Sequence, residues 1–323
     1  MQNAPFYDAI IVHGIWGYGS RAVRQVSKRT GTPYIVFVHG ALDPWFKRQY
    51  PVKHAKKWLY WLLSAHQSLS DANAALFTQK EERDLARNSF RPYKIREAIV
   101  PIGIDDPPPN AAHQREIFFS EYPELRHKRI LLFLSRLHPK KGCDLLIRSF
   151  AEVAEADAAL QLVIAGPDDC GWEKSLRVLT SELHIESRVT WLGTVTGDLK
   201  WGAYRAAEAF TLISHSENFG IVVTEAMACG LPVLTTNKVN IWPDIQRSGA
   251  GIIASDDQVG ATVLLRTWLE KPDSERAQMR EAARRCYVNN FGSHAAATEF
   301  VRFLRKAIDQ ASGSSETKRA LHD

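Results

Sequence analysis

Short apolar runs rich in β-branched residues alternate along the chain with longer segments of helical periodicity. A strand that is buried on both faces carries a continuous apolar run rather than a strict apolar-polar alternation. Strands of this kind form parallel sheets covered by helices, so the pattern predicts an α/β fold. The predicted strands are residues 9–14, 34–40, 74–78, 96–104, 129–137, 160–166, 188–193, 209–215 and 231–236.

Three consecutive prolines at residues 107–109 divide the chain. Proline fixes φ and cannot continue a helix, so we expect a linker from Asp106 to about residue 125. Helices are expected at about 258–288 and 294–311, followed by a polar tail that we expect to be disordered. The predicted organisation is two Rossmann-like, doubly wound domains at 1–108 and 109–292, a C-terminal helix at 293–311 that packs back toward the first domain, and a tail at 312–323.

The composition agrees with two cores, because 323 residues with 45% apolar side chains are enough for about two domains. No run reaches the roughly 20 apolar residues that span a bilayer, and the start of the chain lacks the pattern of a signal peptide. We therefore expect a cytoplasmic protein. The four cysteines are scattered without a C-x-x-C pair, which favours reduced thiols over disulfides or a zinc site.

One candidate site follows the predicted strand at 129–137. The chain turns at Pro139 and Gly142 and enters a helix near residue 143, with Arg136 and Lys141 on either side of the turn. Such a turn directs backbone N–H groups and the positive end of a helix toward an anion, and the two cations add to this. A diphosphate would fit the turn, although two solvated basic residues would give the same pattern.

A second candidate site is the segment 214–233, in which a strand, a polar loop, a helix of about ten residues and a Gly-x-Pro stop follow one another. Glu225 lies among apolar residues on a helix that must pack on the sheet. A buried carboxylate is costly unless it is paired or hydrogen-bonded. Glu217 lies in the preceding loop, and sugar or ribose hydroxyls are natural partners for both carboxylates.

Other chemistries lack their signatures. The chain has no G-x-x-x-x-G-K-[ST] phosphate loop, and its glycines at 14, 17 and 19 do not form G-x-G-x-x-G, which removes the main support for kinase, ATPase and dinucleotide readings. Adjacent aspartates occur at 105–106, 168–169 and 256–257. Neighbouring carboxylates point apart on most backbones, so we interpret these as caps and turns and expect no metal site and no cofactor.

These motifs together resemble family-four retaining glycosyltransferases, which have the GT-B fold. The E-x7-E spacing within S-E-N-F-G-I-V-V-T-E-A-M-A-C-G-L-P-V is similar to the family signature, and S-R-L-x-x-x-K-G is similar to its phosphate-binding loop. The resemblance continues through Pro101-Ile102-Gly103-Ile104-Asp105, where Ile102 stands in place of Asn, and through Ile164-Ala165-Gly166-Pro167-Asp168 and Trp191-Leu192-Gly193. It covers most of residues 5 to 305.

The resemblance implies a role for each matching residue. Arg136 and Lys141 would grip the diphosphate of a nucleotide-diphosphate sugar and stabilise charge on the leaving group. Glu225 would hold the ribose hydroxyls, and Glu217 would lie beside the donor sugar. The backbone N–H groups of a short loop would meet sugar hydroxyls or phosphate, and two glycine turns would flank the base: Asn218, Phe219 and Gly220, then Gly166 and Gly193.

Two predicted strands of the first domain end in His-Gly, at His13 and His39. Glycine at a strand end lets the backbone approach a ligand, and histidine exchanges protons near neutral pH. The motifs resemble those of bacterial polysaccharide-type members of the family, in which the second histidine faces the donor sugar. We therefore expect a catalytic role for His39, while an acceptor-side role and a packing role both stay open for His13.

Residues 45–65 contain five Lys or Arg, five Trp or Tyr and no acidic residue. The net charge is +6 over residues 1–106 and −1 over the rest, so this segment lies in the basic part of the chain. Interleaved basic and aromatic residues favour an anionic membrane surface or a polyprenyl-linked acceptor, with Trp45, Lys56, Lys57 and Trp58 as contact residues. The alternative is a core helix with solvated lysines. No nucleic-acid motif is present.

Members of the family usually carry further strand-helix units before the segment that begins at Tyr7. The resemblance therefore predicts either a misassigned start or an incomplete first domain, and an incomplete domain would have an exposed strand edge near residues 9–13 or 34–38. The predicted function is a retaining, metal-independent hexosyltransferase that moves sugar from a nucleotide-diphosphate donor to a saccharide or lipid-linked acceptor in cell-envelope or exopolysaccharide synthesis. Such a protein could work peripherally at the inner face of the plasma membrane. The alternative is a catalytically impaired protein that only binds nucleotide sugar.

Overall fold

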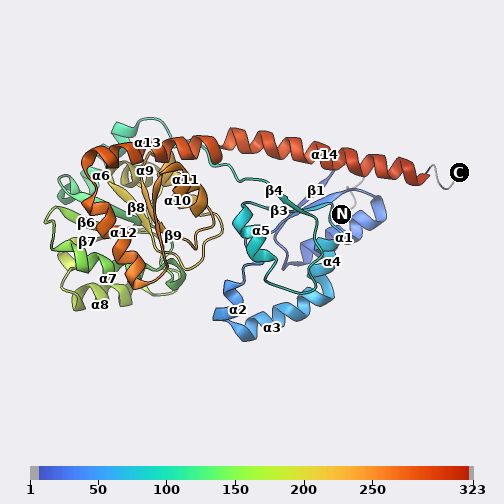
Figure 1. The fold of residues 1–323 in the computed structure, drawn as a ribbon, viewed down its shortest axis with the longest axis horizontal. Coiled ribbons are helices and arrows are strands. Elements are labelled where there is room, and N and C mark those ends of the chain that lie inside the picture. Colours follow the sequence, from blue (N-terminus) through green and yellow to red (C-terminus); the bar gives the residue numbers. More distant parts are fainter. Residues whose placement is uncertain (1–6, 320–323) are drawn as a thin grey trace. The chain divides into compact units, whose positions relative to one another are not determined.

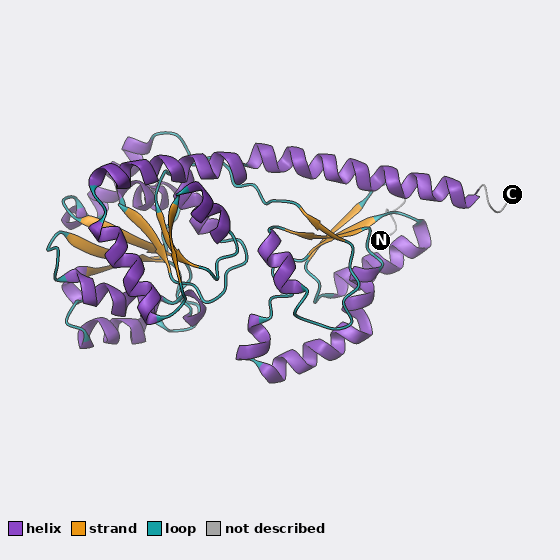
Figure 2. Ribbon diagram, viewed as in Figure 1, coloured by secondary structure: helices purple, strands orange, loops and turns teal. Residues whose placement is uncertain are grey.

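The computed structural model describes residues 7–319, and the side chains of all of these except residues 46, 48 and 311–319. The chain divides into two compact units, one formed by residues up to Gly103 together with those from His294 onward, the other by Ile104–Ser293. Each unit has its own parallel sheet with helices around it (Figures 1 and 2). Each is described by itself.

The first unit is built on a four-stranded parallel sheet in the order β1-β2-β3-β4. In this sheet β1 is an edge strand, which confirms the expected strand edge at residues 9–13. Its strands are β1 (Ile10–His13), β2 (Tyr34–Phe37), β3 (Ala74–Phe77) and β4 (Glu97–Ile99). Its helices are α1 (Tyr18–Thr30), α2 (Trp45–Gln49), α3 (Pro51–Tyr60), the π-helical turn η2 (Trp61–Ala65), α4 (His66–Ser70), α5 (Lys80–Ala86) and α14 (Ser293–Arg319).

Both faces of this sheet are covered, as its continuous apolar strands predict. Successive side chains of a strand point to opposite faces. Tyr34 and Val36 of β2 therefore join the core that contains Trp61, whereas Ile35 and Phe37 face α14. The side chains that α14 contributes to that core are Phe300, Phe303, Leu304 and Ala307.

The tail was expected to be disordered, but α14 continues to Arg319. The polar composition of residues 312–319 hid this extension, since such a composition is typical of disordered segments. The helix can continue because Gly313 is the one strong helix breaker in this segment. Residues 320–323 lie outside the described part of the chain.

The second unit is built on a six-stranded parallel sheet in the order β10-β9-β8-β5-β6-β7. The chain runs outward from β5 to β7 on one side and from β8 to β10 on the other. The direction of winding therefore reverses between β5 and β8, which is the topological switch point of the sheet. The strands are β5 (Arg129–Leu134), β6 (Leu160–Ala165), β7 (Val189–Gly193), β8 (Ala209–Leu212), β9 (Val233–Thr236) and β10 (Gly251–Ala254).

Helices cover this sheet on both sides and carry the connections between its strands (Figure 2). The α-helices are α6 (Ala111–Glu121), α7 (Cys143–Ala154), α8 (Glu173–Glu182), α9 (Gly197–Ala206), α10 (Ile221–Ala228), α11 (Trp242–Ser248), α12 (Gln258–Glu270) and α13 (Asp273–Asn290). Three 3-10 turns complete them: η3 (Pro123–Leu125), η4 (Pro139–Lys141) and η5 (Glu186–Arg188).

The expected linker from Asp106 to about residue 125 is wrong beyond the prolines. Residues 111–121 form α6, which packs against α9 of the second unit. The contact is so close that a Cβ on Gly202 would lie 2.3 Å from the carbonyl oxygen of Gln114. The prolines lie between β4 and α6, and the polar sequence after them hides a helix that buries Phe118 and Phe119.

Two further differences concern the C-terminal part of the second unit. The edge strand β10 was not predicted, because its four residues are only partly buried and too few to give a clear pattern. The predicted helix at 258–288 is broken into α12 and α13 at Pro272, which precedes α13. A proline inside a helix removes a hydrogen bond and clashes with the preceding turn.

Across residues 7–319, no helix combines the length and the apolar character needed to cross a bilayer.

Candidate functional site

The loops after β5 and β8 meet at the switch point of the second sheet. Gly142, with φ +62°, approaches the neighbouring loop so closely that a Cβ would lie 2.0 Å from the carbonyl oxygen of Ile213. The N–H of His215 donates to the carbonyl of Lys140 at 2.8 Å, and the hydroxyl of Ser214 donates to the same carbonyl at 3.0 Å. The two predicted motifs are therefore one structural unit.

Lys141 and Glu217 form an ion pair across these two loops. Their side chains are 11% and 19% exposed, so the pair is mostly withdrawn from water while one side of it stays accessible. The backbone of Glu217 is held by a third loop, since its N–H donates to Lys238 at 2.9 Å and its carbonyl accepts from Asn240 at 3.0 Å. The pair thus has a fixed position at the carboxyl ends of β5, β8 and β9.

The start of α10 lies directly after Glu217. Gly220 has φ +76°, a left-handed conformation that favours glycine, and it turns the chain into the helix. Phe219 is buried, with its ring 5.8 Å from that of Phe291, whereas the Asn218 side chain accepts from Asn240 at 3.4 Å. The ring of Phe219 anchors the loop, which brings the backbone of residues 218–220 to the N-terminal, positive end of α10.

Arg136 lies at the end of β5 and points to solvent. Its side chain is 64% exposed and its nearest carboxylate, that of Asp169, is 3.9 Å away. The backbone beside it is crowded, because a Cβ on Gly166 would lie 1.8 Å from the carbonyl oxygen of Ser135. Gly166 in turn donates to the carbonyl of Gly193 at 2.8 Å. Arg136, Gly166 and Gly193 are therefore neighbours along the carboxyl edge of β5, β6 and β7.

The carboxylate of Glu225 is paired with side chains of the protein itself. One carboxylate oxygen lies 2.8 Å from the ammonium of Lys200, and the other accepts from the hydroxyl of Tyr204 at 3.1 Å. Burial, together with the charge of Glu225, raises the pKa of Tyr204, so the phenol stays a hydrogen-bond donor. The sequence predicted that this carboxylate would need a partner, and both partners come from α9.

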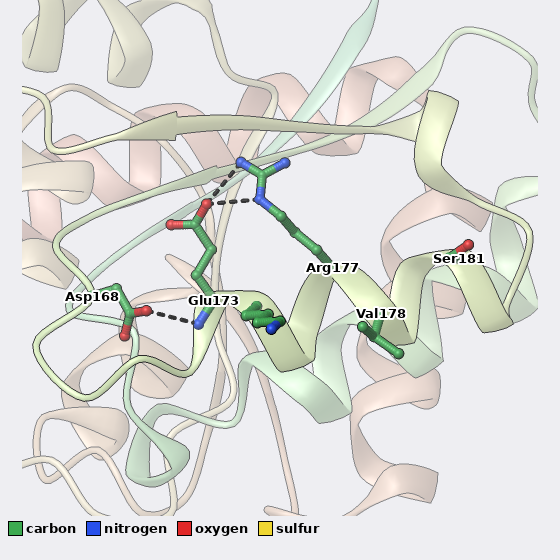
Figure 3. A pocket seen from close by; sticks show the side chains of 6 residues that line it. Asp168, Glu173, Arg177, Val178 and Ser181 are labelled. Carbon is green, nitrogen blue, oxygen red and sulfur yellow. Dashed lines mark hydrogen bonds and ion pairs between the residues drawn. The ribbon is translucent and has the colours of Figure 1, made fainter.

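The hollow shown in Figure 3 lies elsewhere, along α8. It has a volume of about 520 Å³ and is lined by Asp168, Glu173, Lys174, Arg177, Val178 and Ser181. None of the predicted donor-site residues lines it, and two of its charged side chains, Glu173 and Arg177, pair with each other at 2.7 Å. Asp168 accepts three backbone N–H bonds at the start of α8, and Asp257 caps α12, so one aspartate in each of these two pairs has the expected capping role.

In the first unit, His13 and His39 lie together. Nδ1 of His13 is 2.8 Å from Nε2 of His39, and both rings stack with that of Phe37. His39 has φ +50°, an uncommon conformation for a residue with a Cβ. Burial lowers the pKa of His39, and the neighbouring His13 lowers it further. The relation of this pair to Glu217, which belongs to the other unit, stays a prediction.

The segment 45–65 has both of the characters that its sequence left open. Trp61 is fully buried and donates to the carbonyl of Pro92 at 3.0 Å, as expected for a core helix. Trp58 is 45% exposed and Lys56 is exposed, whereas the ammonium of Lys57 lies 5.1 Å from the ring centre of Trp16. Trp45 packs edge-on against Tyr50. Of the four predicted contact residues, Lys56 and Trp58 are thus the most open to solvent.

Three residues near these sites escaped the sequence reasoning. Lys200 lies on a helix with no recognisable motif, and only the need of Glu225 for a cation pointed toward it. Asn240 follows β9, whose carboxyl end could have been searched for polar residues in the same way as that of β8. Glu82 is a buried acid in the first turn of α5, shortly after β3, and apolar periodicity does not reveal it.

The family comparisons cover both units. The model described as glycosyl transferases group 1 matches residues 114–286, more than half of the chain, and the model described as glycosyl transferase 4-like domain matches residues 3–103.

Among curated proteins, the chain is similar to a D-inositol 3-phosphate glycosyltransferase of Rhodococcus opacus, with 31% identity over 50% of this chain and 37% of that protein. It is also similar to the N-acetyl-alpha-D-glucosaminyl L-malate synthase of Bacillus anthracis, with 30% identity over 56% of this chain and 46% of that protein. The chain therefore spans less than half the length of these relatives.

Among solved structures, the chain is similar to sucrose-phosphate synthase from Thermosynechococcus elongatus, with a TM-score of 0.76 and 19% identity over 94% of this chain and 75% of that one. It is also similar to HepE of Anabaena in complex with UDP, with a TM-score of 0.77 and 17% identity over 94% and 80% of the two chains. At these identities the likeness concerns the fold.

Proposed function

This chain belongs to the glycosyl transferases of group 1, it has the GT-B fold that its sequence predicted, and we propose that it transfers a hexose-type sugar from a nucleotide-diphosphate donor with retention of configuration. The reaction class would be that of EC 2.4. Solved structures of the same fold contain UDP or UDP-glucose, which supports a nucleotide sugar as the substrate.

The observation that carries this proposal is the Lys141–Glu217 pair at the switch point of the second sheet. Ligands of open α/β sheets bind outside the carboxyl ends of the strands at such a point. A lysine held there by a single carboxylate can exchange that partner for a diphosphate, and the released carboxylate then lies next to the sugar attached to the diphosphate. The pair thus offers both a cation for the phosphate and an acceptor for sugar hydroxyls.

The other residues fit around this pair. Arg136 is exposed and would turn onto the diphosphate. The backbone N–H groups of Asn218, Phe219 and Gly220 at the start of α10 would donate to phosphate or sugar oxygens. Glu225 would hold the ribose hydroxyls beside Lys200. The glycine turns at Gly166 and Gly193 would flank the base.

We propose a metal-independent reaction in which fixed cations meet the charge of the leaving group. The bond between the anomeric carbon and the diphosphate breaks, the acceptor oxygen forms a bond on the same face, and its proton passes to the departing phosphate. Lys141 and Arg136 stabilise that phosphate, a contribution for which single preorganised groups are typically worth about 10²–10³ in rate. His39, kept neutral by burial, would contact the donor sugar.

The acceptor we propose is a saccharide or a polyprenyl-linked saccharide of the cell envelope or of an exopolysaccharide. His13 would lie on its side of the reaction. Such acceptors are assembled on the cytoplasmic side of a membrane, so the protein would act in the cytoplasm, peripherally at the inner face of the plasma membrane.

A panel of nucleotide-diphosphate sugars tests the proposal. We expect one of them to raise the melting temperature of the protein and to be hydrolysed slowly in the absence of acceptor, because a ligand that binds only the folded state stabilises it. The Glu225→Ala and Lys141→Met variants should lose both effects. Stabilisation without hydrolysis or transfer would instead identify a binding protein, and no response to any donor would contradict the proposal.

A further inference from the structure

The outer face of α3 and η2 carries large apolar side chains although it lies in water. Val52, Leu59 and Leu63 are 73%, 56% and 70% exposed. They are spaced by seven and four residues, so they follow one stripe along a continuous helix. Contiguous exposed apolar side chains of this kind are uncommon on a soluble surface and mark an interaction site.

The stripe is distinct from the face of the helix that packs into the core. The opposite face is packed, with Trp61 fully buried, its ring 5.2 Å from that of Phe90, and with Ser64 and Ala65 buried beside it. The helix therefore has one apolar face inside the protein and a second one outside, and folding explains only the first.

The surroundings of the stripe are basic. Lys56 lies between Val52 and Leu59 along the helix, and Lys53 lies on one flank of the stripe; both are exposed. The sequence between Asp43 and Asp71 contains no acidic residue. Aromatic residues complete the rim, since Tyr50 and Trp58 are 40% and 45% exposed. The ammonium of Lys53 lies 4.9 Å from the ring centre of Tyr50, so cation and aromatic ring are presented together.

This combination fits a lipid surface better than other partners. Aliphatic side chains enter the boundary between headgroups and acyl chains, Trp and Tyr prefer the headgroup level, and lysines attract anionic headgroups. Nucleic acid would use the cations but would leave Val52, Leu59 and Leu63 in water. The ten residues of α3 are enough to lie in the plane of a membrane and too few to cross it.

We propose that α3 and η2 form a docking face for a bilayer that contains anionic lipids, with Val52, Leu59 and Leu63 inserted among the headgroups and Lys53 and Lys56 on the lipid phosphates. This docking face deepens the proposed function, because it would bring the protein to lipid-linked acceptors. It also narrows the expected membrane contact from the whole segment 45–65 to one stripe, which does not include the buried Trp61.

Sedimentation with vesicles tests the docking face. The full chain is mixed with vesicles of phosphatidylcholine that contain 30% phosphatidylglycerol, and with vesicles of phosphatidylcholine alone. We expect binding to the anionic vesicles that weakens as salt rises, because surface charges are screened. The double variant Leu59→Gln, Leu63→Gln should reduce binding about tenfold or more. The double variant Lys53→Gln, Lys56→Gln should reduce it about 25-fold, since each lysine near such a surface is worth roughly fivefold.

Matched variants elsewhere serve as controls. Val259 is as exposed as Val52, and Lys306 is an exposed lysine of α14, so Val259→Gln and Lys306→Gln should bind vesicles like the unchanged protein. Equal binding to both kinds of vesicle, or equal losses in the controls, would overturn the proposal. So would self-association that Leu59→Gln, Leu63→Gln abolishes in the absence of vesicle binding, which would make the stripe an interface between two copies.

Donor binding is measured on the same variants. All of them should keep the donor-induced rise in melting temperature, because none of the changed residues is proposed to bind the donor, and the residues proposed for the diphosphate and the ribose belong to the other unit. A stripe variant that loses vesicle binding but keeps donor binding would support the docking face without bearing on sugar transfer. If the unchanged protein bound the donor but no vesicles, the docking face would be wrong and the sugar-transfer proposal would stand.

Discussion

The carboxylate of Glu82 accepts a hydrogen bond from the backbone N–H of Gly40 at 2.6 Å. Its second oxygen accepts from both the N–H and the hydroxyl of Thr78, at 2.6 and 2.7 Å. Glu82 is 3% exposed, so this buried acid depends on these three donors. It ties the start of α5 to the turn after β2, where His39 and Gly40 both have positive φ.

Replacing Glu82 by Gln should loosen this turn. The NH₂ group of Gln is a donor, and it would meet the N–H of Gly40 or Thr78 where a carboxylate oxygen now accepts. Hydrogen bonds to a charged group contribute about 1.5–3 kcal/mol, so we expect a loss of about 2 kcal/mol in the stability of the first unit. Denaturant unfolding measures it. Glu81→Gln on the same helix turn is the control and should change stability by less than about 0.5 kcal/mol. Equal effects of the two variants would mean that the Gly40 contact carries no special weight.

The depressed pKa of His39 predicts a pH dependence of stability. Folding lowers this pKa by burial and by the nearness of His13, so the folded state disfavours the protonated ring. The contribution is present above the ordinary histidine pKa of about 6.5 and is lost as the pH falls through the lower, folded value. We expect the melting temperature to fall as the pH drops below about 6.5, and His39→Gln to flatten that part of the curve. A curve that keeps its slope in the variant would assign the effect to other groups.

Breaking the Lys141–Glu217 pair should affect transfer more than stability. Lys141→Met removes the cation proposed for the leaving phosphate, and we expect a loss of about 10²–10³ in kcat/KM, as for other single preorganised groups. Lys141→Arg keeps the charge and should recover part of the activity. Glu217→Gln leaves Lys141 free and should keep diphosphate binding, measured by calorimetry with UDP as the first probe, while sugar transfer falls.

The site was predictable where chemistry follows directly from a strand end. Lys141 and Glu217 each follow a continuous apolar run, and parallel strands bring such positions to the same edge of a sheet. Their direct pairing was not predictable, because it depends on β5 and β8 being neighbours although β6 and β7 intervene in sequence. Strand order is a long-range property that local periodicity does not contain.

The same limit explains the other differences. α6 was missed because its buried face is defined by α9, some 80 residues further along the chain, rather than by its own weak apolar pattern. The sequence showed the basic and aromatic surroundings of the outer stripe of α3, but it did not single out the apolar residues of the stripe itself. The sequence did not reveal which side chains of this helix face the core. That is defined by the packing of Trp61 against Phe90.

Lys200 offers a test of the ribose site. Its ammonium holds one oxygen of Glu225, so Lys200→Met should leave that carboxylate with Tyr204 as its partner and change its position. We expect about tenfold weaker binding of the nucleoside diphosphate, close to the loss of one charge-assisted hydrogen bond. Lys200→Arg should retain most of the affinity. Unchanged calorimetric binding by Lys200→Met would show that Glu225 does not need this partner to meet the ligand.

The packing of α6 on α9 predicts a severe effect at Gly202. A Cβ there would lie 2.3 Å from the carbonyl oxygen of Gln114 and 2.8 Å from Cβ of Phe118, distances that the two helices can relieve only by moving apart. Gly202→Ala should therefore destabilise the second unit by about 1–3 kcal/mol, the usual cost of overpacking, despite the better helix propensity of Ala. Gly19→Ala in α1 is the matched control, because nothing lies within 4 Å of its Cβ position and Ala there should be neutral or stabilising by up to about 1 kcal/mol. Thermal unfolding of both variants decides the matter, and an unchanged melting temperature for Gly202→Ala would mean that α6 does not hold the second unit together as its close contact implies.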